Sequence, residues 1–256
     1  MQIDLNADLG EADTDEGRAA ELAVLATVSS VNVACGAHAG DLESMRRTIA
    51  AASAHGVAIG AHPGYADRDA RGRRELTLPP VAVTALVRDQ IRLLVSVAAA
   101  ARVRLAHVKP HGALYNQAAR QFALAAAIAD AIREVDPSLC LVGLAGSCLI
   151  QAGRDAGLRV ASEAFADRAY EPDGSLVPRG RPGAVIDHVE TVVTQARQIA
   201  TEQRVIAIDG SALTLVADTI CVHGDTPGAA ALARSVRSVL EAAGVDIRAL
   251  EHAGRS

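Results

Sequence analysis

The sequence predicts an α/β fold in which parallel strands alternate with helices and close into a (β/α) barrel. The chain has 256 residues, a length that fits one barrel of this kind. Short apolar runs alternate with longer Ala- and Arg-rich segments of helical period, and this repetition requires parallel pairing through helical crossovers. Seven strand candidates favour a seven-stranded, irregular barrel. An open, doubly wound sheet is the alternative.

The strands are predicted from the apolar runs and the helices from the apolar spacing between them. Predicted strands cover residues 2–8, 31–35, 57–61, 105–109, 139–143, 158–163 and 219–223. Predicted helices cover residues 17–29, 41–55, 79–102, 117–135, 146–156, 187–202 and 226–243. Residues 204–216 are predicted to form a hairpin around Asp209-Gly210.

Several helix boundaries carry the expected residues. Asp41 is predicted to cap the second helix, and Gly56 to end it. Thr226 is predicted to cap the last helix, with Pro227 at its first position. We find no linker, so residues 1–256 are expected to form a single domain.

The composition limits the class of protein. Hydrophobic residues make up 50% of the chain, which allows a large core, although only 2% of residues are aromatic. The formal net charge of −5 argues against a nucleic-acid partner. No apolar run reaches the roughly 18 residues that a membrane span needs, and the N-terminus lacks a signal-peptide pattern. The four cysteines show no C-x-x-C spacing, so we expect a cytoplasmic protein with reduced thiols.

The first strand has a polar face where a barrel strand would be apolar. Asp4, Asn6 and Asp8 alternate with apolar residues, so their side chains point to one side of the sheet. Such a face is costly in a barrel interior unless it is hydrogen-bonded or functional. The alternative is an edge strand with one face in solvent.

Polar residues follow almost every predicted strand. The C-terminal ends of barrel strands meet at one rim, where active sites of this fold are built. Lys109, which follows the fourth strand, is the only lysine among 25 Lys and Arg residues. We therefore predict one site at this rim, and its catalytic candidates are Asp8, Glu11, His38, His62, Lys109 and His111.

These residue types suit acid–base chemistry, with two carboxylates, neutral imidazoles and one ammonium. Asp8, His38 and His62 together are an alternative metal triad, although no local metal-binding motif supports it. A cysteine nucleophile is disfavoured because Cys35 and Cys221 lie in apolar strands. The chain has no P-loop and no G-x-G-x-x-G after a strand, so it lacks a recognisable nucleotide-binding motif.

A second group of rim residues is predicted to bind substrate. Arg179 follows the sixth strand and is a candidate partner for a substrate carboxylate. The arginine-rich loop 68–74 is expected to be mostly solvated. The remaining candidates for substrate binding are Asn6, Asp41, His223 and Asp225.

Six segments of the chain resemble the LamB/YcsF family. They run in order from residue 4 to residue 228: 4–11 (DLNADLGE), 32–41 (NVACGAHAGD), 60–64 (GAHPG), 108–116 (VKPHGALYN), 163–170 (EAFADRAY) with 176–179 (LVPR), and 220–228 (ICVHGDTPG). The chain departs from the usual family pattern at Ala37, Gly64 and Ala70.

The resemblance implies a seven-stranded barrel related to glycosidases and polysaccharide deacetylases. It also implies hydrolysis of 5-oxo-L-proline to L-glutamate coupled to ATP hydrolysis, as the A subunit of a 5-oxoprolinase with partner subunits B and C. Our hypothesis is that ATP phosphorylates the amide oxygen and that Asp8, His38 or His62 then activates water. Lys109 would stabilise negative charge on oxygen.

Two alternatives remain open. One is a metal-dependent deacetylase or amidase that uses a divalent cation. The other is a binding subunit that holds 5-oxoproline or a sugar without turning it over.

Overall fold

The computed structural model describes residues 1–222 and 228–250, and its centre is a closed barrel of seven parallel strands. The strands pair in the order β1 (Gln2–Leu9), β2 (Ser30–Ala34), β3 (Ala58–His62), β4 (His107–Val108), β5 (Cys140–Leu144), β6 (Val160–Phe165) and β9 (Thr219–Cys221). β1 pairs with both β2 and β9, which closes the barrel and confirms the predicted fold class. β1 is therefore not an edge strand, and the open-sheet alternative is wrong.

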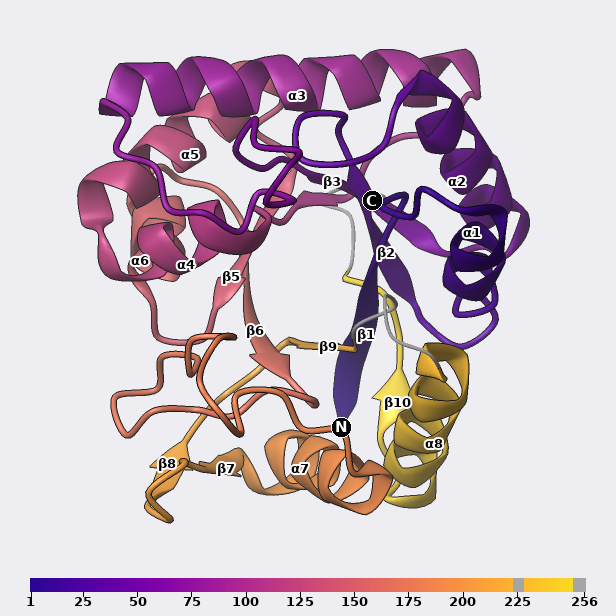
Figure 1. The fold of residues 1–256 in the computed structure, drawn as a ribbon, viewed down its shortest axis with the longest axis vertical. Coiled ribbons are helices and arrows are strands. Elements are labelled where there is room, and N and C mark those ends of the chain that lie inside the picture. The colour runs from indigo at the N-terminus through magenta and orange to yellow at the C-terminus, as the bar shows by residue number, and fades with distance from the viewer. Residues whose placement is uncertain (223–227, 251–256) are drawn as a thin grey trace.

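Helices surround the barrel (Figure 1). Those that the structure describes are α1 (Asp15–Leu22), α2 (Leu42–Ala54), α3 (Pro80–Ala100), α4 (Gly112–Arg120), α5 (Phe122–Val135), α6 (Cys148–Asp155), α7 (Val189–Glu202) and α8 (Ala229–Ala242). Asp41 caps α2 by accepting the amide of Ser44, as predicted. None of the described helices is long and apolar enough to cross a membrane.

Within residues 1–222 and 228–250, the structure contains three short strands outside the barrel, of which two were predicted. The hairpin predicted around Asp209-Gly210 is present as β7 (Arg204–Ile206) paired with β8 (Ala212–Thr214). β10 (Asp246–Ile247) pairs with β1 outside the barrel and was not predicted. The proposed cap Thr226 and its neighbour Pro227 lie outside the described residues.

Two helix predictions are wrong. The segment predicted as one helix over 117–135 is two helices, α4 and α5, and α4 already begins at Gly112. The break is at Gln121, whose extended backbone (φ −123°, ψ 100°) ends one helix and precedes the next. The first helix ends at Leu22 instead of continuing to residue 29. The chain then turns back so that the Ser29 amide donates to the carbonyl of Leu5.

The polar face of β1 is hydrogen-bonded inside the barrel. The Asp4 carboxylate accepts from Ser29 (2.6 Å), Ser30 (2.7 Å) and Thr219 (2.6 Å). Asn6 donates to Thr219 at 2.7 Å and to Glu163 at 3.0 Å. These bonds compensate for the desolvation of buried polar groups, and they form the floor beneath the rim.

Candidate active site

The rim of the barrel brings together all six predicted catalytic residues. Asp8 lies near the end of β1, His62 ends β3, and Lys109 follows β4. Glu11 and His38 follow β1 and β2, and His111 precedes α4. The described part of the chain has a cavity of about 560 Å³ here, and of these six residues Asp8, Glu11, His62, Lys109 and His111 line it. Their catalytic roles remain predictions.

His62 and His111 face each other with their ring nitrogens. The Nδ1 atom of His62 lies 2.7 Å from the Lys109 carbonyl oxygen, and Nε2 of His111 lies 2.9 Å from the Arg71 carbonyl oxygen. A carbonyl oxygen only accepts hydrogen bonds, so these outer nitrogens carry the protons. The inner nitrogens, His62 Nε2 and His111 Nδ1, lie 2.9 Å apart.

Two carboxylates lie beside this pair. Asp8 Oδ2 is 3.3 Å from Nε2 of His62, and Glu11 Oε1 is 3.2 Å from Nδ1 of His111. Burial opposes ionisation of Glu11, but its close contacts with His111 and His38 outweigh it and hold the pKa of Glu11 well below its usual value. Burial also acts to lower the pKa of His62, but Asp8 and Glu11 together raise it.

His38 supports Glu11 without reaching the cavity. Its Nε2 lies 3.2 Å from Glu11 Oε1, and its ring stacks on that of His111 with centroids 3.8 Å apart. Burial lowers the pKa of His38 to about 4, so His38 is neutral at pH 7. His38 does not line the cavity.

Lys109 is buried between two carboxylates. Its Nζ lies 3.0 Å from Asp8 Oδ1 and 2.7 Å from Glu163 Oε1, and it donates to Cys221 Sγ at 3.2 Å. Burial alone would lower the pKa of Lys109, but the negative charge around it raises that pKa well above its usual value. Lys109 is therefore a permanent cation that fixes the orientation of Asp8.

Two acidic residues that were not among the predicted site residues shape the site. Glu163 is fully buried in the C-terminal half of β6; its position near a strand end and its place at the start of segment 163–170 were the signals in the sequence. Glu21 of α1 accepts the amides of Gly10 (3.0 Å), Glu11 (3.0 Å) and Ala12 (2.8 Å). Glu21 thereby holds the turn that presents Glu11, and no local sequence pattern indicates this.

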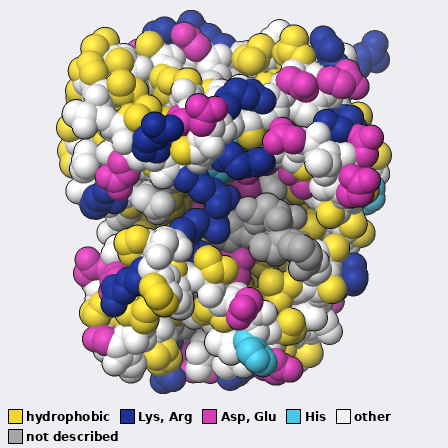
Figure 2. All heavy atoms as spheres, in the orientation of Figure 1, with side chains coloured by type: hydrophobic (Ala, Val, Ile, Leu, Met, Phe, Trp, Pro, Cys, Tyr) yellow, Lys and Arg dark blue, Asp and Glu magenta, His cyan; other side chains and the backbone are white. Residues whose placement is uncertain are grey.

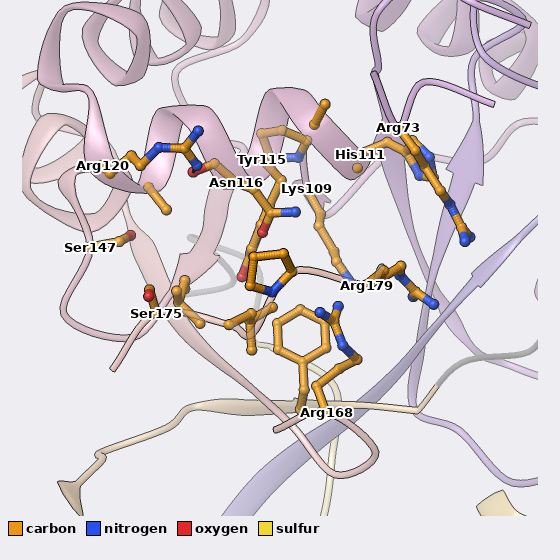
Figure 3. Close-up of a pocket in the computed structure, with 18 of the residues that line it drawn as sticks. Arg73, Lys109, His111, Tyr115, Asn116, Arg120, Ser147, Arg168, Ser175 and Arg179 are labelled. Carbon is orange, nitrogen blue, oxygen red and sulfur yellow. Dashed lines mark hydrogen bonds between the residues drawn. The ribbon is translucent and has the colours of Figure 1, made fainter. Parts of the chain in front are cut away.

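The predicted substrate-binding residues have different locations. Arg179 lines the cavity (Figure 3). Asn6 does not line it, because its side chain is used inside the barrel by Glu163, Thr219 and Asn32. Asp41 is exposed and caps α2 away from the cavity, so a substrate contact is not supported. The other two predicted residues, His223 and Asp225, lie outside the described residues.

Arginine side chains gather around the cavity. Figure 2 shows basic side chains gathered near the centre of the face that it presents. Four of the described arginines line the cavity: Arg73, Arg120, Arg168 and Arg179 (Figure 3). Arg168 is buried and donates to the carbonyls of Ala184 (3.0 Å) and Val177 (2.6 Å). Burial, followed by the nearby charge of Arg179, lowers the pKa of Arg168 to about 10. This part of the cavity suits an anionic group.

The arginine-rich loop 68–74 is mostly exposed to solvent, as predicted, and two of its arginines also bond to backbone carbonyls of neighbouring loops. Arg68 donates to the carbonyls of Gly36 (2.8 Å) and Gly40 (3.0 Å). Arg71 donates to the carbonyl of Glu11 at 2.5 Å. The loop therefore ties together the segments that follow β1 and β2.

Two groups of side chains have the spacing of metal ligands. They are Asp8 with His62 and His111, and Glu11 with His38 and His111; within each group the ligand atoms lie within 4.8 Å of one another. The triad predicted from sequence, Asp8 with His38 and His62, is not one of these groups. The Nε2 atom of His38 is directed at Glu11, and His111 is the histidine that lies beside Asp8 and His62.

The sequence and the structure are similar to known proteins over nearly the whole chain. The chain is 51% identical to the A subunit of 5-oxoprolinase from Tolumonas auensis, over 97% of this chain and 99% of the relative. It is 49% identical to the protein of the same name from Heliobacterium modesticaldum, over 97% and 98% of the two chains. The crystal structure of the lactam utilization protein from Thermus thermophilus superimposes with a TM-score of 0.89 at 44% identity, covering 98% of this chain and 100% of that one. The LamB/YcsF family model matches residues 3–255, and the chain belongs to this family.

Proposed function

We propose that the chain is the A subunit of an ATP-dependent 5-oxoprolinase, which opens the lactam of 5-oxo-L-proline to L-glutamate. The observation that carries this proposal is the set of acid–base groups on one cavity wall, Asp8, Glu11, His62 and His111. It occurs in a chain about half identical to proteins named as this subunit. A lactam is an amide, and its hydrolysis needs proton transfers of the kind these groups supply.

The chemistry has three steps. The γ-phosphoryl group of ATP passes to the amide oxygen, which makes the ring carbon more electrophilic. Water loses a proton to Asp8 or His62 and adds to that carbon; the C–N bond then breaks as the nitrogen takes up a proton. The resulting acyl phosphate reacts with a second water, which releases inorganic phosphate and leaves L-glutamate. Asp8 and His62 are favoured over His38 because His38 does not line the cavity.

Lys109 is assigned a positioning role. Its ammonium is already engaged by Asp8 at 3.0 Å and Glu163 at 2.7 Å. It therefore orients Asp8 and offsets its negative charge. This positioning role replaces the hypothesis that Lys109 stabilises negative charge developing on the substrate oxygen. Arg179, an exposed residue that lines the cavity, is assigned the carboxylate of 5-oxoproline.

ATP and the partner subunits B and C complete the proposal. A small ring substrate fills only part of a cavity of about 560 Å³, and the chain has no recognisable nucleotide motif of its own. We infer that subunits B and C contribute to handling ATP. The four free thiols are consistent with a cytoplasmic location for this single barrel domain.

The test is glutamate release from 5-oxoproline and ATP, with the chain and subunits B and C purified and combined. We expect glutamate only when all three subunits and ATP are present. Asp8→Asn should abolish release while the subunits still assemble, and the exposed control Asp89→Asn should leave it unchanged. Absence of glutamate with all three wild-type subunits would contradict the proposal. Calorimetric binding of 5-oxoproline with no turnover would favour a non-catalytic binding subunit.

A metal-dependent deacetylase or amidase is the second candidate. It is favoured by the close approach of His62 Nε2, His111 Nδ1 and Asp8 Oδ2. Hydrolysis of an acetylated or amide substrate by the isolated chain without ATP would distinguish it from the first proposal.

A further inference from the structure

We propose that Asp8, Glu11, His62 and His111 form a binding site for one divalent transition-metal cation, such as Zn²⁺, in the cavity wall. The inference concerns the same wall as the proposed function, but it rests on the geometry of these four side chains and not on ATP or the partner subunits. The residues come from three different parts of the barrel rim, so the fold and not a local motif creates the site.

The two histidines present lone pairs to the same point. Their outer nitrogens donate to the carbonyl oxygens of Lys109 (2.7 Å) and Arg71 (2.9 Å). In neutral imidazoles this leaves His62 Nε2 and His111 Nδ1 as bare acceptors 2.9 Å apart, which repel unless something positive lies between them. Metal-binding histidines typically donate their other N–H to a backbone carbonyl or a carboxylate, as both rings do here.

The separations agree with coordination of a single small cation. Bonds of about 2.0–2.1 Å at angles between a right angle and the tetrahedral value place neighbouring ligand atoms about 2.9–3.4 Å apart. The His62–His111 pair is at 2.9 Å, the His111–Glu11 pair at 3.2 Å and the His62–Asp8 pair at 3.3 Å. The His62–Glu11 pair, at 3.7 Å, is slightly wider. The ligand atoms of Asp8, His62 and His111 all lie within 4.8 Å of one another, and binding of all four side chains to one cation requires the carboxylates to shift toward it.

The local charge also favours a cation. Asp8, Glu11 and Glu163 are three carboxylates, and Lys109 is the one ammonium in this cluster, in contact with Asp8 and Glu163. When both histidines are neutral, which is the form that binds a metal, the ionised cluster carries two net negative charges in a largely buried place. Buried charge is expensive without a counter-charge, and one divalent cation would neutralise this excess.

The surroundings support a catalytic type of site. His38 donates to Glu11 Oε1 at 3.2 Å and fixes that carboxylate from behind. Asp8, Glu11, His62 and His111 all line the cavity, so a bound cation would keep a coordination position open for water or a carbonyl oxygen. A single shared proton is the competing occupant, because it too can lie between the two histidine nitrogens.

The experiment measures metal binding by the full chain, produced without a histidine tag and stripped with a chelator. Calorimetry with Zn²⁺ and separately with Mn²⁺ should show one saturable site per chain, whereas Mg²⁺ should bind at least about 100-fold more weakly because it disfavours imidazole ligands. His62→Gln and His111→Gln should each weaken Zn²⁺ binding at least about 100-fold. The exposed control His188→Gln should bind as tightly as wild type.

A second measurement keeps the test independent of how well the variants fold. X-ray absorption of the Zn²⁺-loaded wild-type chain should show nitrogen and oxygen ligands at about 2.0–2.1 Å with two imidazoles. Three results would each overturn the proposal: absence of saturable binding, sulfur ligands in the absorption spectrum, or unchanged affinity in both folded histidine variants. A proton shared between His62 and His111 would then be the occupant of the site. The three-subunit glutamate assay is separate, so glutamate release by a chain that binds no metal would remove the cation site and retain the proposed function.

Discussion

The Lys109 ammonium lies 2.7 Å from the Glu163 carboxylate, and both side chains are almost completely buried at the centre of the barrel rim. Glu163 belongs to β6 and Lys109 follows β4, so their contact spans the barrel interior. Asp8, from β1, completes the ion cluster at 3.0 Å. Three strands thus meet through one charge network, which links the stability of the barrel to the geometry of the site.

Glu163→Ala should destabilise the protein strongly. It removes one partner of a buried ion pair and leaves Lys109 undercompensated, which typically costs about 3–5 kcal/mol. Urea unfolding followed by circular dichroism measures the loss. The control Glu190→Ala breaks an exposed pair with His188, and it should change the free energy of unfolding by less than about 0.5 kcal/mol. Equal effects of the two substitutions would exclude the buried pair as a stabilising contact.

Lys109→Arg should lower kcat of the three-subunit enzyme about 100-fold, comparable to the loss of a preorganised electrostatic contact. The planar guanidinium is larger than an ammonium and cannot occupy the same position between Asp8 and Glu163. The matched control is Arg104→Lys, an exposed exchange between the same two residue types, which should leave turnover unchanged. Full activity of Lys109→Arg would remove the ammonium from the mechanism.

Much of the fold can be predicted from the sequence because strands and helices leave local patterns of apolar and polar residues. The alternation of apolar runs with helical segments predicts the seven barrel strands, and the polar alternation of Asp4, Asn6 and Asp8 correctly indicates a functional or hydrogen-bonded barrel interior. The rule that strand ends share one rim places Asp8 near His62, and the structure finds them 3.3 Å apart.

The remaining features depend on tertiary contacts that leave no local pattern. The break at Gln121 contains neither Gly nor Pro, so helical spacing alone joins α4 to α5. In the sequence, Glu21 resembles any acidic residue of an amphipathic helix. Only the structure shows that its carboxylate accepts hydrogen bonds from the backbone amides of residues 10–12. The choice between His38 and His111 as the partner of His62 depends on ring orientation, which spacing does not encode.

Gly60→Ala should destabilise the barrel by about 1–3 kcal/mol or more, as overpacking does in tight cores. A Cβ atom at Gly60 would lie 2.2 Å from the ring of His107, and moving that ring would disrupt its 2.7 Å contact with Asn32. The control is Gly180→Ala, because a Cβ there meets nothing within 4 Å and the backbone φ is not positive. Thermal unfolding should show a lower Tm for Gly60→Ala only.

The buried thiols should resist alkylation in the folded protein. Burial raises the pKa of Cys35 to about 12 and that of Cys140 to about 11, so at pH 8 only about one Cys35 in 10⁴ is a thiolate. With iodoacetamide, mass spectrometry should find modification at the half-buried Cys148 first. All four cysteines should react once urea unfolds the chain. Rapid labelling of Cys35 or Cys140 in the folded state would contradict the burial of these two thiols.

Arg179→Ala should raise KM for 5-oxoproline and leave kcat nearly unchanged. Arg179 lines the cavity but is not one of the acid–base groups, so its contact with the substrate carboxylate would be equal in ground and transition states. Loss of one charge-assisted hydrogen bond, about 1.5–3 kcal/mol, corresponds to an increase in KM of roughly 10- to 150-fold. The control is Arg181→Ala, because Arg181 is exposed, pairs with Glu171 and does not line the cavity. A fall in kcat at constant KM would instead assign Arg179 to the chemical step.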